Sequence, residues 1–121
     1  MKYWFPVILW MAAIFTLSSF PDYYFPKNRP EYLSTIVHFI EYIILGLLFI
    51  RALTHSGSRL SSVSITVISI LLASLYGVTD EIHQYFVPGR EMVFTDWLVD
   101  FSGTVIGVVL YEYIERFSLN H

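Results

Sequence analysis

The residues from Tyr76 to Arg90 combine carboxylates, an imidazole, an amide and a guanidinium at the end of a long apolar run. Carboxylate and imidazole groups are the usual proton donors and acceptors of active sites, and the planar guanidinium of Arg90 suits a phosphate or carboxylate. Ionisable groups near membrane depth are costly and are therefore candidates for function. We predict site residues here at Tyr76, Asp80, Glu81, His83, Gln84 and Arg90.

Two further polar groups accompany this stretch in other apolar segments. His38 and Glu41 lie three residues apart, and Asp96 and Asp100 lie four apart, so each pair occupies one face of a helix. We predict that all three groups line one site. Its catalytic members are predicted to be His38, Glu41, Asp80, Glu81, His83 and Gln84, and its substrate-binding members Tyr76, Arg90, Asp96 and Asp100.

The charge balance of this site leaves three arrangements open. Its carboxylates cannot all stay ionised in a buried setting without a counter-charge. They are protonated, paired with Arg90 and the histidines, or bound to a metal cation. The pairs His38-x-x-Glu41 and Asp80-x-x-His83 are of a kind that holds metals in helix bundles. A divalent metal is the less favoured interpretation, because two-residue patterns recur by chance.

Simpler structural roles compete with these functions. His38 and Glu41 can lock two helices together through hydrogen bonds, and Arg90 can be a solvated turn residue after a Pro-Gly pair. Asp96 suits the first turn of a helix, where negative charge is favoured. Asp100, one turn deeper, has the weaker structural explanation.

The composition indicates that these residues belong to an integral membrane protein. The chain has 121 residues, of which 55% are hydrophobic and 14% charged, and its mean hydropathy is +0.59. A soluble domain carries about 25% charged residues. The net charge of −3 argues against nucleic acid as a partner. The absence of cysteine excludes disulfides and thiolate metal sites.

Four apolar segments predict an all-α fold, a bundle of four transmembrane helices with short loops in a single domain over residues 1–121. Each segment approaches the roughly 20 residues that cross a bilayer as a helix. The first is a membrane helix rather than a cleaved signal peptide, because a small-residue cleavage site is lacking. The predicted segments are Tyr3–Phe20, Leu33–Thr54, Val63–Phe86 and Thr95–Tyr113.

Alternation of direction along four helices places all three polar groups on the same membrane face. The glycines of Gly103-x-x-x-Gly107 predict that the last helix approaches a neighbour closely. Positive charge favours the cytoplasmic side, so we expect both termini in the cytoplasm. The side with the termini holds Lys2, Arg51, Arg59 and Arg116, against Lys27, Arg29 and Arg90 on the other.

Several ordered motifs resemble the VanZ-like family of small bacterial membrane proteins, which is named for a member linked to teicoplanin resistance. They are Ile14–Ser19, the His38-Phe-Ile-Glu-Tyr42 motif with Leu45, the Tyr76–Gln84 stretch with Pro88-Gly-Arg90, Asp96, and the Gly103/Gly107 pair. The resemblance implies a four-helix protein of the bacterial inner (cytoplasmic) membrane and, loosely, a role in glycopeptide tolerance. Asp100 departs from it, since the family pattern leads us to expect Asn there.

Three functions fit these features. The first is an enzyme that modifies a lipid-linked substrate of the cell envelope. The second is a non-catalytic protein that binds a lipid or a glycopeptide antibiotic. The third is a proton-coupled carrier, for which four helices are few. Neither the residues nor the resemblance names a reaction or an oligomeric state.

Overall fold

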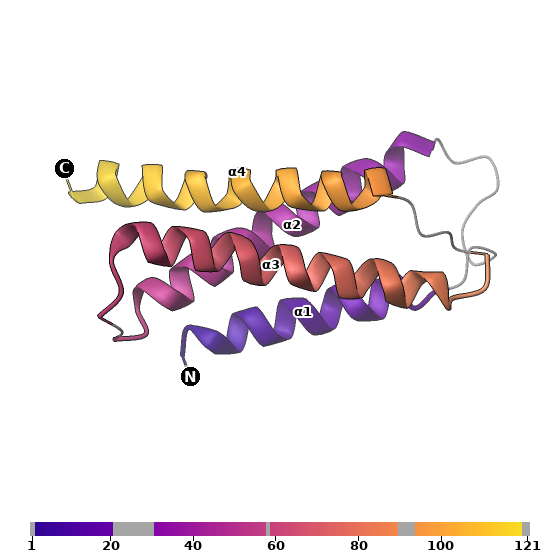
Figure 1. The fold of residues 1–121 in the computed structure, drawn as a ribbon, viewed down its shortest axis with the longest axis horizontal. Helices are drawn as coiled ribbons and strands as arrows, with labels where there is room; N and C mark the ends of the chain where they lie inside the picture. Colours follow the sequence, from indigo (N-terminus) through magenta and orange to yellow (C-terminus); the bar gives the residue numbers. More distant parts are fainter. Residues whose placement is uncertain (1, 21–30, 58, 90–93, 120–121) are drawn as a thin grey trace.

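Four helices make up the fold in a computed structural model, which describes residues 2–20, 31–57, 59–89 and 94–119. They are α1 (Trp4–Ser18), α2 (Glu31–Thr54), α3 (Ser62–Tyr85) and α4 (Phe94–Leu119). Successive helices run in opposite directions, so α1 begins and α4 ends at the same end of the bundle (Figure 1). The predicted all-α class is confirmed. The main difference from the predicted segments is that α4 continues six residues beyond Tyr113.

Three of the helices are long and apolar enough to cross a membrane, and they make the chain a multi-pass membrane protein. These are α2, α3 and α4, with mean hydropathies of 2.1, 1.8 and 1.3 over their most apolar windows. The first helix is also apolar but has only 15 residues, which corresponds to a length of about 22 Å. A bilayer core is about 30 Å thick. The sequence therefore predicted a longer first helix than the one observed.

The distribution of side chains is inverted relative to a soluble protein. Large apolar side chains such as Val63, Leu75 and Phe5 are more than half exposed, whereas Asp80 and Asp100 are buried. Apolar atoms on the outer surface match a lipid environment, and the carboxylates of Asp80 and Asp100 lie at contacts between helices. The interior of the bundle is therefore where chemistry must be sought.

The closest helix pair is α2 with α4, and glycines make it possible. A Cβ atom on Gly103 would lie 2.6 Å from the carbonyl oxygen of Phe39, and a Cβ atom on Gly107 would overlap the backbone of Ile43. Gly46 makes the same kind of approach from the α2 side. Small residues let membrane helices touch backbone to backbone. The predicted close packing at Gly103 and Gly107 is confirmed, with α2 as the partner.

Hydrogen bonds from aromatic side chains tie the other helices together. The indole nitrogen of Trp10 in α1 donates to the backbone carbonyl of Glu41 at 2.9 Å, and Trp97 in α4 donates to the carbonyl of Ser74 in α3 at 3.2 Å. The hydroxyl of Tyr76 in α3 donates to the carbonyl of Met11 in α1. These bonds fix the rotation of each helix and hence the direction of its polar side chains.

Candidate functional site

Three helices bring four ionisable side chains to one point in the bundle. His38 comes from α2, Asp80 and Glu81 from α3, and Asp100 from α4; one ligand-type atom of each lies within 4.8 Å of the others. We call these four residues the buried cluster. His38 and Asp100 lie roughly 10 Å inside the starts of their helices, at the rise of 1.5 Å per residue. The sequence predicted that these side chains lie at the same depth, and in the structure they also lie close together.

The carboxylates of the buried cluster are almost completely inaccessible. Asp80, Glu81 and Asp100 are 3%, 4% and 0% exposed. Among the described residues, Asp80 Oδ1, both carboxylate oxygens of Glu81 and both of Asp100 have no hydrogen-bond partner. Buried polar atoms are normally satisfied, and an unpaired buried carboxylate is costly. These oxygens therefore call for a cation, a proton or a ligand.

Adjacent residues Asp80 and Glu81 both face inward because α3 touches several helices. Neighbouring side chains on a helix diverge by about 100°, so one of the two would normally face outward. α3 contacts α1, α2 and α4, which gives it a wide buried face. Both carboxylates therefore point into the bundle.

A small polar shell surrounds the buried cluster. The Nδ1 atom of His38 lies 3.4 Å from Asp100 Oδ1, and the hydroxyl of Tyr42 donates to Asp80 Oδ2 at 3.4 Å. Ser18 at the end of α1 is buried within hydrogen-bonding reach of Asp80. Tyr42 was not among the site residues predicted from the sequence. The signal that could have found it is its spacing of four from His38.

Other predicted site residues lie around the buried cluster rather than in it. Glu41 and Gln84 are buried nearby, on α2 and α3. His83 turns toward α1, where its Nε2 atom is 2.9 Å from the hydroxyl of Ser19 and its ring stacks on Phe15. Of the pair Asp80-x-x-His83, only Asp80 therefore belongs to the buried cluster.

The predicted substrate-binding residues are spread more widely. Asp100 belongs to the buried cluster, whereas Asp96 is partly exposed in the first turn of α4. The hydroxyl of Tyr76 is engaged with α1. Arg90 lies outside the described residues. The roles of all these residues stay predictions.

The described basic residues are far from the buried cluster. Lys2 and Arg51 lie over the ring of Tyr3, and Arg116 is in the last turn of α4. These residues, like Arg59 before α3, are at the end of the bundle where α1 begins and α4 ends (Figure 1). Within the described part of the chain, histidine alone supplies positive charge near the cluster.

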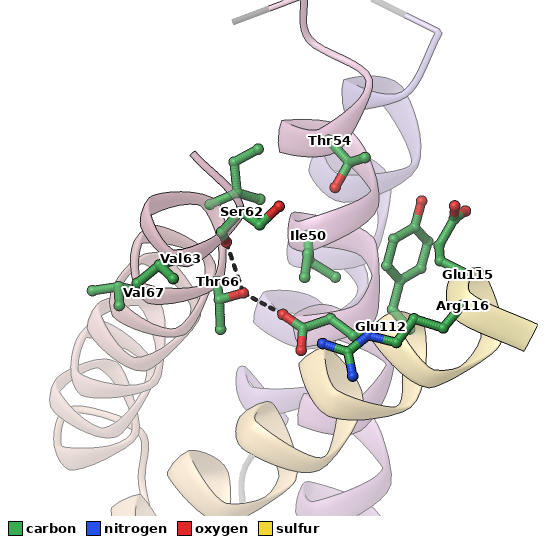
Figure 2. Close-up of a pocket in the computed structure, with 11 residues that line it drawn as sticks. Ile50, Thr54, Ser62, Val63, Thr66, Val67, Glu112, Glu115 and Arg116 are labelled. Atoms are coloured by element: carbon green, nitrogen blue, oxygen red, sulfur yellow. Dashed lines mark hydrogen bonds between the residues drawn. The ribbon is translucent and has the colours of Figure 1, made fainter. Parts of the chain in front are cut away.

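A second polar feature occupies that opposite end. An open groove of about 390 Å³ lies between the start of α3 and the end of α4, and Figure 2 shows residues that line it. The hydroxyl of Thr66 donates both to the Ser62 carbonyl and to the carboxylate of Glu112. Glu112 and Arg116 lie one turn apart on α4, a spacing at which side chains pair. We call this feature the polar groove.

The donor set of the buried cluster defines its chemistry. An imidazole and three carboxyl groups in a low-dielectric setting can exchange protons among themselves and with a reactant. The same atoms are also common ligands of divalent metals. The polar groove, whose carboxylate is already hydrogen-bonded, has less reason to do either.

Comparison with known proteins agrees with this architecture. Searches of curated proteins and of solved structures gave no significant match. The model of one protein family, described as VanZ/LLP1, matches residues 3–115, which cover α1 to α3, α4 up to residue 115, and every member of the buried cluster. The chain thus belongs to the VanZ/LLP1 family.

Proposed function

We propose that this protein is an enzyme of the bacterial cell envelope that modifies a lipid-linked substrate at one face of the inner membrane. The observation that carries the proposal is the meeting of His38, Asp80, Glu81 and Asp100 within 4.8 Å inside a membrane bundle. Folding alone gives no reason to bury three carboxylates together, because their desolvation opposes folding. Intramembrane ionisable groups are typical of functional sites.

The position of the cluster suits a substrate whose polar part lies at the headgroup level. The cluster is about two helical turns from the membrane end where α2 and α4 begin, as the rise per residue requires. At that depth a pocket of about 330 Å³ opens between α2 and α4 on the outer surface, lined by residues such as Ile36, Phe39 and Leu98. This mostly apolar pocket lies at a depth similar to that of the cluster, which supports a substrate with a lipid tail.

Within this proposal, each cluster residue has a distinct task. Asp100, 3.4 Å from His38 Nδ1, orients the imidazole and balances its charge when it is protonated. Asp80 or Glu81 then serves as the partner acid or base, because a carboxylate oxygen of each lies within 4.8 Å of an imidazole nitrogen of His38. Tyr42 holds Asp80 in place through its hydroxyl. Such division of labour among carboxylates is typical of proton-transfer sites.

The test compares envelope lipids from three strains by mass spectrometry: a deletion strain, and the same strain carrying wild-type protein or Asp80→Asn. We expect a covalent difference in one lipid-linked species that wild-type protein restores and Asp80→Asn does not. The matched control is Glu112→Gln, which changes a carboxylate of the polar groove. Restoration by Asp80→Asn that equals restoration by wild-type protein would refute the assignment, provided that both proteins are present in the membrane.

A non-catalytic binding function is the second candidate, and the burial of the cluster favours it. Asp100 is 0% exposed, so a reactant and a non-reacting ligand must both displace side chains to reach it; a binding protein needs this opening once, whereas an enzyme needs it in every turnover. Teicoplanin susceptibility of the same strains distinguishes the two. Altered susceptibility with unchanged lipid chemistry supports binding; a new or missing lipid species supports the enzyme. A proton-coupled carrier would need additional helices from another subunit.

The proposal includes a topology in which all four helices cross the membrane as one domain and both termini face the cytoplasm. Single cysteines in this cysteine-free chain test it: Phe86→Cys, at a position that is 75% exposed, and Leu60→Cys, at one that is 44% exposed. We expect a membrane-impermeant maleimide to label Phe86→Cys in spheroplasts and Leu60→Cys only after permeabilisation. The reverse pattern would invert the orientation, and labelling of both in spheroplasts would disprove it.

A further inference from the structure

We propose that His38, Asp80, Glu81 and Asp100 bind one divalent metal ion, of the kind that accepts mixed nitrogen and oxygen ligands, such as Zn²⁺ or Mn²⁺. The proposal concerns binding, and it stands whether or not the protein is an enzyme. A metal that binds without any lipid modification would remove the proposed activity and leave this site in place.

The spacing of the four side chains fits one ion. Their ligand-type atoms lie within 4.8 Å of one another. Nitrogen and oxygen ligands lie about 2.0–2.2 Å from Zn²⁺, so two ligands on opposite sides of the ion are roughly 4 Å apart. Contraction of the cluster by less than an ångström would complete the coordination. Such movement is within the reach of carboxylate side chains through their rotamers.

The unsatisfied atoms point to a cation rather than to a neutral ligand. Glu81 and Asp100 are at least nine-tenths buried, and none of their carboxylate oxygens has a hydrogen-bond partner among the described residues. His38 Nδ1 is in the same condition. Together these atoms present an excess of acceptors and one imidazole nitrogen. A single divalent ion would satisfy all of them at once, without protonation of any of the three carboxyl groups.

The charges around the cluster agree with this. From α2 it is faced by His38 and by Glu41, which is also buried, and from α3 by Asp80 and Glu81, with His83 nearby. From α4 it is faced by Asp100, and Asp96 is close enough to act on Glu81. α1 contributes the neutral Ser18. Carboxylates outnumber histidines, and the described Lys and Arg side chains lie at the other end of the bundle.

Only one residue of each pair predicted from helical spacing belongs to the proposed metal site. The sequence pairs His38 with Glu41 and Asp80 with His83, but His83 is held by Ser19 and Phe15 at the edge of the bundle. The cluster instead takes one member of each pair and adds Glu81 and Asp100. One imidazole with three carboxylates favours ions that accept nitrogen and oxygen, and excludes ions that need thiolate.

Direct measurement of bound metal tests the proposal. The full-length protein is purified in detergent, stripped with a chelator and dialysed against Zn²⁺ or Mn²⁺ alone, and the bound metal is counted by elemental mass spectrometry. We expect about one ion per chain in the wild type and in the control Glu112→Gln. Glu81→Gln and Asp100→Asn should lower the affinity by at least about tenfold, because even second-shell substitutions cost that much.

Thermal unfolding in the same detergent keeps the test decisive if one variant folds poorly. A saturating ion should raise the unfolding temperature of the wild type and of Glu112→Gln, because ligands that bind only the folded state stabilise it. At the same ion concentration the rise should be smaller for Glu81→Gln, because its affinity for the ion is lower. The absence of saturable binding in the wild type would overturn the proposal. So would equal affinity in the wild type, Glu81→Gln and Asp100→Asn, since that would place the ion elsewhere.

Discussion

The two ends of this bundle use the same kinds of residue in opposite ways. At one end, Glu112 lies in the open polar groove and accepts a hydrogen bond from Thr66. At the other, Glu81 is 4% exposed and neither of its carboxylate oxygens has a hydrogen-bond partner among the described residues. A carboxylate at the groove is accommodated by its surroundings. A carboxylate in the buried cluster is held there by the fold at the expense of stability.

The closest packing in the fold is between the two helices that carry His38 and Asp100 of the buried cluster. Gly103 and Gly107 bring α4 against α2, and these are the helices that carry Asp100 and His38. Without this contact the imidazole and the carboxylate would not lie 3.4 Å apart. Natural proteins accept strain and unsatisfied groups at functional sites when the rest of the structure holds them in place. The glycine contact is the part of the structure that holds this one.

The largest change in stability is therefore expected from a substitution at the contact between α2 and α4. Gly107→Ala would place a Cβ atom against the backbone of Ile43 and within 3.0 Å of Leu47 N, so α2 and α4 must separate. We expect a loss of about 3 kcal/mol in the free energy of unfolding, at the upper part of the range for overpacking. Thermal or denaturant unfolding in detergent measures the change.

The matched control is Gly77→Ala in α3. Its Cβ atom would lie 3.4 Å from Asp100 Cβ, an ordinary van der Waals distance, and alanine favours a helix by up to about 1 kcal/mol over glycine. This variant should be as stable as the wild type or more so. If Gly107→Ala is as stable as Gly77→Ala, the α2–α4 contact does not hold the site in the way argued above.

A smaller effect of opposite sign is expected from Glu81→Gln. In the presence of a chelator, the amide removes a buried carboxylate and can donate hydrogen bonds to Asp80 or Asp100. We expect the variant to be more stable than the wild type by about 1–3 kcal/mol, as for other buried charges replaced by neutral groups. Glu112→Gln, in the polar groove, should change the stability by less than about 0.5 kcal/mol. Equal changes in the unfolding free energies of Glu81→Gln and Glu112→Gln would contradict the proposed difference between the buried cluster and the polar groove.

The convergence at the buried cluster could be predicted from the sequence because helical spacing and alternating direction determine it. His38, Asp80 and Asp100 each lie within about two turns of a helix end, and those ends share one face of the membrane. The spacing of Gly103 and Gly107 likewise predicted the close packing of α4 against a neighbouring helix. These are properties of single helices and of their order, which a sequence displays directly.

The membership of the cluster could not be predicted, because it depends on how each helix is rotated against its neighbours. The spacing of Asp80 and His83 makes them look equivalent, but Ser19 and Phe15 draw His83 toward α1. Tyr42 joins the site through a contact between α2 and α3. The first segment was predicted to be longer than α1 because its bounds were set by the aromatic residues Tyr3 and Phe20, which lie just outside the helix.

The smallest expected effect distinguishes buried Tyr42 from partly buried Tyr76, whose ring centroids lie 6.5 Å apart. Tyr42 donates to Asp80 Oδ2 over a long distance of 3.4 Å, whereas Tyr76 donates to the carbonyl of Met11. Replacing either by phenylalanine should cost about 0.6 kcal/mol in unfolding free energy, the average for a hydrogen bond between membrane helices. Only Tyr42→Phe should also weaken metal binding, by about tenfold, because only Tyr42 orients a ligand.

Stability and metal affinity measured on the same two samples separate a residue that supports the buried cluster from one that supports the bundle. Equal metal affinities for Tyr42→Phe and Tyr76→Phe would mean that Asp80 keeps its position without Tyr42, and that Ser18 or the helix backbone fixes it instead.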